Sequence, residues 1–220
     1  MTDFNYFENS MVNSVKITIP KEIKIQLQMG EYIDRAIDYY IFSRRAVMLG
    51  VVPVGGTLFH VAVEMLMLCG LSTKYSQDEL KSKFSKHELP YIWSEFKKIF
   101  GDTDLRKLDK FINHHRQWKE LRYPGRKGKS STIFFGRKKP DPEIMKKNME
   151  YNKADILIEI NLEEMDEFIT TVVKAIGINP DHIKIHLQRN KELIELYLTE
   201  NSFPLFKTDS MVNSANLLKG

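Results

Sequence analysis

The sequence predicts an all-α protein with at most a small β element, and three observations lead to this prediction. Apolar residues recur at helical spacing along most of the chain. The stretch 57–69 is apolar nearly all round, which is typical of the central helix of a bundle. Apolar residues alternate with others only over short stretches, at residues 15–19 and 156–160. We therefore expect a bundle of four or five core helices with two further carboxy-terminal helices.

Each predicted helix has a local signal for where it begins or ends. The spacing of apolar residues predicts helices over 31–49, 57–69, 76–84, 89–100, 102–122, 141–151, 162–176 and 180–199. Asn161, with Glu164 three residues later, is typical of a capping box, and Gly177 ends that helix. Pro180 is well placed to begin the last helix. The alternation at residues 156–160 predicts a short strand, which we expect to pair with residues 15–19.

The most apolar part of the chain raises the question of a membrane span. Between residues 46 and 71 the only charged residue is Glu64. Pro53, Gly55 and Gly56 are expected to end the preceding helix, because proline and glycine destabilise helix interiors. The remaining stretch, 57–71, is too short to cross a bilayer. We expect a buried core helix and no membrane.

Composition fits a folded protein with an uneven charge distribution. Of the 220 residues, 42% are hydrophobic, which is too many for a disordered chain. The single cysteine, Cys69, excludes a disulfide within the chain, and residues 1–14 do not resemble a signal peptide, so a cytoplasmic location is expected. The net charge is +4, but residues 122–139 hold seven basic residues and no acidic one, which leaves the rest of the chain mildly acidic.

This basic segment, residues 122–139, is the clearest functional signal. Clustered lysines and arginines neutralise phosphates, and aromatic rings among them stack on unpaired bases. The predicted RNA-binding residues are Arg122, Tyr123, Arg126, Lys127, Lys129, Phe134, Phe135, Arg137, Lys138 and Lys139. The alternative is a solvated loop that its two phenylalanines anchor to the bundle. A nucleotide-binding phosphate loop is not expected, because only two residues separate Gly125 from Gly128, where four are needed.

Three segments resemble the HEPN family of helical bundles. They are LFHVAVEMLML at 58–68, HELPYIW at 87–93 and LRYPG at 121–125, in the order and spacing of that family. The resemblance covers roughly residues 31–125. It implies a domain order of amino-terminal extension (1–30), HEPN-like core (31–125), basic loop (126–140) and carboxy-terminal helices packed on the core (141–220).

The resemblance also carries expectations about activity and partners. Ribonucleases of the family place an arginine, four to six residues and then a histidine near the start of a helix. Here seven residues separate Arg106 from His114, which is too many, and no arginine–histidine pair in the chain has the required spacing. The resemblance therefore implies a non-catalytic protein of defence or toxin–antitoxin systems that binds RNA or a nucleotide and forms a homodimer, with a nucleotidyltransferase-type partner. Four aromatic residues favour dimerisation as extra apolar surface: Tyr39, Tyr40, Trp93 and Trp118.

The histidines have both chemical and structural interpretations. His60 and Glu64 lie four residues apart and therefore share one helix face. One interpretation is that they line a polar pocket with His87 and His115. The interpretation that we favour is a hydrogen-bonded pair in the core. His115 is also a candidate general base, if Arg116, Arg122 or Tyr123 contacts a phosphate. The spacing of His182 and His186 suits a metal, but we expect a solvated helix face, no metal and no cofactor.

The sequence leaves three hypotheses for function. The first is a non-catalytic HEPN-like protein that binds RNA or a nucleotide through the basic segment. The second is a divergent, metal-independent ribonuclease. The third is a structural, partner-binding helical protein. Salt-dependent RNA binding separates the first from the third, and RNA cleavage without added metal separates the second from both.

Overall fold

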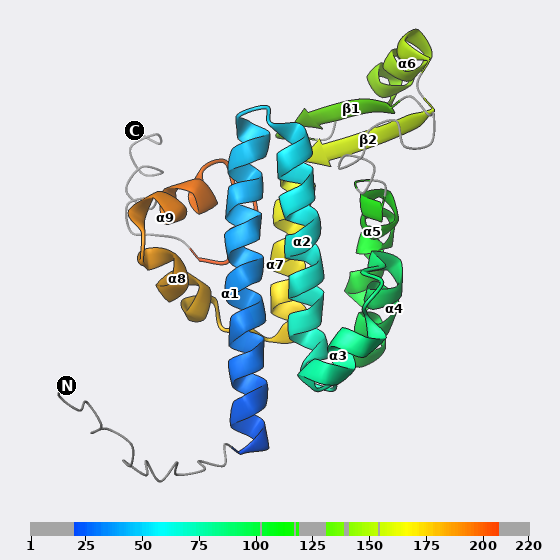
Figure 1. The fold of residues 1–220 in the computed structure, drawn as a ribbon. Coiled ribbons are helices and arrows are strands. Elements are labelled where there is room, and N and C mark those ends of the chain that lie inside the picture. Colours follow the sequence, from blue (N-terminus) through cyan, green and yellow to red (C-terminus); the bar gives the residue numbers. More distant parts are fainter. Residues whose placement is uncertain are drawn as a thin grey trace, which may run out of the picture.

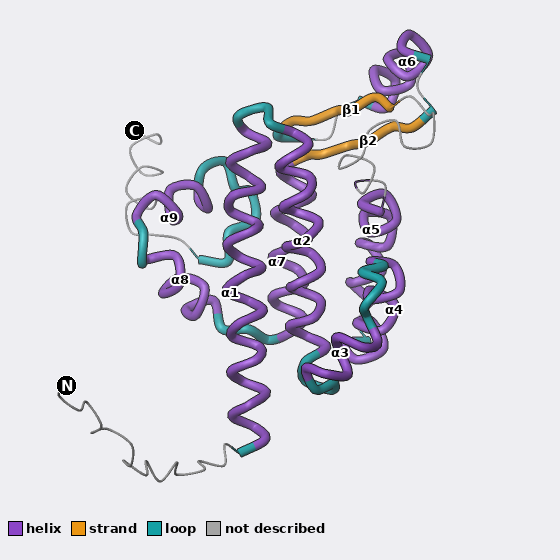
Figure 2. The backbone as a smooth tube through the Cα atoms, in the orientation of Figure 1, coloured by secondary structure: helices purple, strands orange, loops and turns teal. Residues whose placement is uncertain are grey.

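The computed structural model describes residues 20–101, 103–116, 118, 131–138, 141–153 and 155–206. It confirms the all-α fold class with a minor β element (Figures 1 and 2). The elements are α1 (Lys21–Met48), α2 (Val52–Leu71), α3 (Gln77–Lys83), α4 (Leu89–Phe100), the 3₁₀ helix η1 (Thr103–Leu108), α5 (Asp109–His115), β1 (Ser131–Gly136), α6 (Pro142–Asn152), β2 (Ile156–Asn161), α7 (Leu162–Ile176), α8 (Pro180–Gln188) and α9 (Lys191–Leu198).

Helix α2 lies at the centre of the bundle. It packs against α1, α4 and α7, while α8 and α9 cover the outer side of α1 (Figure 1). Phe59, Ala62, Val63, Leu66 and Met67 are fully buried, as expected for the stretch 57–69. By length and composition α2 could cross a bilayer, and 72% of its most apolar 18-residue window is buried inside the fold.

The start of α2 corrects the prediction that the central helix begins at residue 57, although α1 does end before residues 49–51, as expected. The helix begins at Val52, with Pro53 in its first turn, where the missing N–H has no intrahelical partner to lose. Gly55 allows close contact with α1, since an added Cβ there would lie 2.6 Å from Val47 Cγ2. Ser43 strengthens this contact by donating a 2.7 Å hydrogen bond from its hydroxyl to the Gly55 carbonyl. The prediction failed because Pro53 is compatible with a first helical turn and Gly55 with a close contact between two helices.

The boundaries of three other predicted helices also differ from the prediction. Helix α1 begins at Lys21, ten residues before the predicted start. The prediction began too late because the apolar stripe is weak over residues 21–30, although these residues are helical. The predicted helix 180–199 is two helices, since Asn190 caps α9 by accepting a hydrogen bond from the Glu192 N–H. The predicted helix 102–122 begins as η1 and continues as α5.

The sheet consists of two parallel strands. Strand β2 pairs in register with β1, from Ser131 opposite Ile156 to Gly136 opposite Asn161, and α6 connects the strands. The pairing of β2 with β1 was not predicted, and residues 15–19, the predicted partner, lie outside the described residues. Part of the predicted basic loop, residues 131–136, is thus a strand. Residues 156–161 do form the predicted strand, and Asn161 caps α7 as expected, accepting from the Glu164 N–H at 2.8 Å.

Candidate nucleic-acid interface

The described part of the basic segment lies at one end of the α1–α2 hairpin. Strand β1 approaches the turn between these helices, and α6 lies at the far end of the strands (Figure 1). Phe134, Phe135, Arg137 and Lys138 belong to this part. The other predicted RNA-binding residues lie outside the described residues: Arg122, Tyr123, Arg126, Lys127, Lys129 and Lys139.

The sheet positions the two phenylalanines differently. Phe135 lies opposite Ile160 of β2, which is buried, and Phe134 lies opposite Glu159. Phe134 is half-buried, whereas Phe135 is 53% exposed. The Phe135 ring also faces the α1–α2 turn, because a Cβ built on Gly50 would be 3.9 Å from it. Phe135 is therefore held at the end of the bundle with much of its ring open to solvent.

A pocket of about 370 Å³ adjoins Phe135. It is lined by Val47, Met48, Phe135, Gly136, Arg137, Leu162, Thr199 and Glu200. Arg137 Nε lies 2.5 Å from Glu200 Oε2, and the Arg137 side chain is 75% exposed. The Arg137 carbonyl accepts a 3.1 Å hydrogen bond from the Glu163 N–H, which fixes the end of β1 to the start of α7. The pocket thus combines apolar walls with an ion pair.

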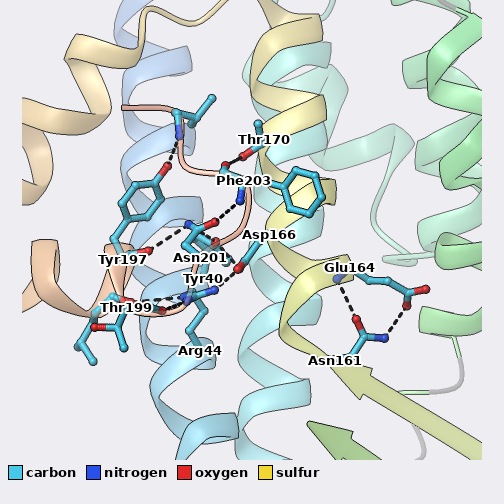
Figure 3. A network of polar contacts seen from close by, with 12 residues as sticks. Tyr40, Arg44, Asn161, Glu164, Asp166, Thr170, Tyr197, Thr199, Asn201 and Phe203 are labelled. Carbon is cyan, nitrogen blue, oxygen red and sulfur yellow. Dashed lines mark hydrogen bonds and ion pairs between the residues drawn. The ribbon is translucent and has the colours of Figure 1, made fainter. Parts of the chain in front are cut away.

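A buried polar network that the sequence did not predict holds the backbone of Thr199, one of the residues that line this pocket (Figure 3). Arg44 and Asp166 are completely buried and form an ion pair between α1 and α7. Arg44 also donates to the Thr199 carbonyl, and the Tyr40 hydroxyl donates to Asp166 Oδ1 at 2.6 Å. Burial raises the pKa of Asp166 and raises that of Tyr40 well above its ordinary value. The pair fixes the backbone directly before Glu200.

Further hydrogen bonds continue the network into residues 201–206. The Asn201 amide donates to the Tyr197 carbonyl at 3.0 Å and accepts from the Phe203 N–H at 2.8 Å. Thr170 of α7 donates to the Phe203 carbonyl at 2.5 Å, and the Tyr197 hydroxyl accepts from the Leu205 N–H at 2.7 Å. The segment after α9 is therefore attached to both α7 and α9 (Figure 3).

The structure favours a core role for His115. Its ring packs edge-on against Phe59, stacks on Phe111 and lies 3.8 Å from the centre of the Trp118 ring. Neither ring nitrogen has a hydrogen-bond partner within the described part of the chain. Burial holds the pKa of His115 well below its ordinary value, so the ring is neutral. Arg116 is exposed on the surface, and Arg122 lies outside the described residues.

The predicted polar group of four residues separates into two pairs. Glu64 Oε1 lies 2.5 Å from His87 Nδ1, and the carboxylate is buried whereas the His87 ring is mostly exposed. The His60 ring stacks on His115, with 5.4 Å between centroids. His87 also has a positive φ of 52°, which is uncommon for a residue with a side chain. The Glu64–His87 contact holds the loop before α4 against α2.

We expect Glu64→Ala to lower the free energy of unfolding by roughly 1–3 kcal/mol, because the change removes the hydrogen bond between the buried Glu64 carboxylate and His87. Thermal denaturation should show a melting temperature several degrees lower. Glu31→Ala, an exposed change on α1, is the control and should leave the melting temperature unchanged. If Glu64→Ala melts as the parent does, Glu64 has no structural role.

The two carboxy-terminal histidines bind α8 to α1, which corrects the expectation of a solvated face. His182 Nε2 lies 3.0 Å from Asp34 Oδ1. His186 lies between Asp34 and Asp38, at 3.1 and 3.0 Å, and its side chain is only 8% exposed. Arg189 also pairs with Asp38. Among the residues that the structure describes, no group of three or more His, Cys, Asp or Glu is arranged to hold a metal ion.

Comparisons with family models, with curated proteins and with solved structures gave no match to this chain.

Proposed function

We propose that this chain is a non-catalytic, HEPN-like protein that binds single-stranded RNA through its basic segment. The observation that carries the proposal is the exposed ring of Phe135 beside the exposed side chains of Arg137 and Lys138, at one end of the α1–α2 hairpin. An aromatic face next to cationic side chains suits a strand with unstacked bases and regular phosphates.

The packing of the segment supports binding over a merely solvated loop. Strand β1 is fixed by its ladder with β2 and by the hydrogen bond from Glu163 to the Arg137 carbonyl. Such anchoring reduces the conformational entropy lost when a ligand binds. A loop that needed its phenylalanines only as anchors would bury both, yet Phe135 stays largely exposed.

The second candidate, a ribonuclease using His115, has less support. The His115 ring is enclosed by aromatic side chains, whereas a general base must reach the proton that it abstracts. The homodimer rests on the HEPN resemblance alone, because Tyr40, Trp93 and Trp118 are buried within the chain, and only Tyr39 is exposed. The nucleotidyltransferase-type partner rests on the same resemblance.

Salt dependence tests the proposal. The affinity for a fluorescent single-stranded RNA should fall with salt along a log–log slope of roughly −2 to −3, since each neutralised phosphate contributes about −0.7 and three or four cations are engaged. Replacing four lysines of the segment with alanine should flatten the slope and leave the melting temperature unchanged: Lys127, Lys129, Lys138 and Lys139.

A matched control removes the same charge elsewhere. The control variant replaces four exposed lysines of other elements with alanine: Lys81, Lys86, Lys110 and Lys146. It should keep the parent's slope. Equal losses in the two variants would mean that only net charge matters, and no RNA affinity at low salt would reject the proposal. Gel analysis of the RNA after incubation without metal should show intact strands, and cleavage would favour the ribonuclease.

A further inference from the structure

We propose that the pocket beside β1 holds one guanine base of the bound RNA, an inference that rests on the function proposed above. The pocket joins residues that are far apart in the sequence, from α1, β1, α7 and the segment after α9. Phe135 and Arg137 of the basic segment line the pocket, which places it on the path of a strand that follows this segment.

The size of the pocket suits a single ring system. Its volume of about 370 Å³ lies near the lower end of the range of about 300–1,000 Å³ for small-molecule sites. A dinucleotide cofactor needs a larger site. Met48, Leu162 and Val47 supply apolar walls, and the exposed ring of Phe135 offers a face for stacking. A flipped base buried between aromatic and apolar side chains is the usual arrangement for a base-reading pocket.

The ion pair in the pocket favours guanine. A carboxylate only accepts hydrogen bonds, and a guanidinium only donates them. Guanine is the base whose Watson–Crick edge presents two adjacent N–H donors next to a carbonyl acceptor. Glu200 can accept from the two donors, while Arg137 donates to the carbonyl. Adenine, cytosine and uracil each present only one donor group on this edge, so the carboxylate receives one hydrogen bond from them where guanine gives two.

The backbone around Glu200 is already fixed in place. Glu200 has a φ of 56°, a left-handed conformation that a glutamate adopts at a cost. The buried Arg44 holds the Thr199 carbonyl directly before it, and Arg44 is itself held by Asp166. Such strain persists only where surrounding contacts enforce it, and it is concentrated at ligand sites. The network in Figure 3 therefore fixes the Thr199 backbone, to which Glu200 is joined, while the ion pair with Arg137 holds the Glu200 carboxylate.

The test compares three 12-nucleotide RNAs by fluorescence anisotropy: all uridine, uridine with one central guanosine, and uridine with one central abasic site. The guanosine strand should bind at least tenfold more tightly than the other two, because only it fills the pocket. Phe135→Ala and Glu200→Gln should each remove most of this preference, and Phe135→Ala, which changes no charge, should keep the salt slope of the parent. Tyr151→Ala, which removes a highly exposed ring on α6, is the control and should change nothing.

The outcomes separate this inference from the proposed function. Equal binding of the three RNAs with a normal salt slope would overturn the guanine pocket and leave RNA binding intact. No binding of any RNA would reject both. A last arm uses 5′-GMP alone: weak binding supports a base within RNA, whereas affinity equal to that of the guanosine strand would assign the pocket to a free nucleotide and contradict the RNA proposal.

Discussion

Replacing Arg44 with methionine is expected to lower the free energy of unfolding by about 3–5 kcal/mol, because the change leaves Asp166 as an unpaired charge in a buried site. Arg44 and Asp166 are both completely buried, and the pair connects α1 to α7. For a chain of this size, the melting temperature should fall by roughly 10 °C, as measured by circular dichroism during heating.

Arg45 provides a matched control on the same helix. Its side chain is exposed, so Arg45→Met should change the melting temperature by no more than a degree or two. The double variant Arg44→Met, Asp166→Leu removes both charges and should recover much of the loss, since apolar replacements of a buried pair are often neutral. If Arg44→Met and Arg45→Met melt alike, Arg44 contributes no more than a surface charge.

The same change also bears on the guanine pocket. Arg44 holds the Thr199 carbonyl, and Glu200 follows directly. Below its melting temperature, Arg44→Met should therefore bind the guanosine RNA no better than the all-uridine strand. The Arg44 pair then acts as a positioning device for the pocket as well as a support for the core.

Elements with strong local signals were predicted from the sequence with correct bounds. Helix α4 spans residues 89–100 as predicted, and α7 begins after its Asn161 cap and ends at Gly177. These ends depend on residues close to them in the sequence, such as the capping Asn161 and the left-handed Gly101 and Gly177, so a single sequence contains the necessary information. The start of α2 depends instead on how closely Gly55 approaches α1, which is a tertiary contact.

The candidate site was predicted only in part, for the same physical reason. Phe135 and Arg137 were identified from charge and composition, but the pocket needs Met48 and Glu200, which only the fold brings together. The Arg44 network did have a signal. Position 44 continues the stripe of Ile37, Tyr40 and Ile41 at helical spacing, so an arginine there lies on the buried face and requires a partner.

Acidification is expected to destabilise the protein through His115. Burial lowers the pKa of His115 well below its ordinary value, so the folded state keeps the ring neutral. The unfolded chain takes up a proton below about pH 6.5, the ordinary pKa of histidine. Because the unfolded state then binds more protons, stability is present in full above this pH and falls by about 1.4 kcal/mol per unit below it. The loss should therefore grow steadily as the pH falls from 7 to 5.

Chemical denaturation at a series of pH values measures this loss, and two variants assign it. His115→Leu removes the titrating group, so its free energy of unfolding should vary less between pH 7 and pH 5 than that of the parent. Ile112→Val is the control in the same buried helix, and it should lower stability by about 0.5–1.5 kcal/mol equally at every pH. Parallel pH curves for the parent and His115→Leu would show that His115 is protonated alike in both states. Its ring would then have a polar partner in the folded protein, and the candidate general base would regain support.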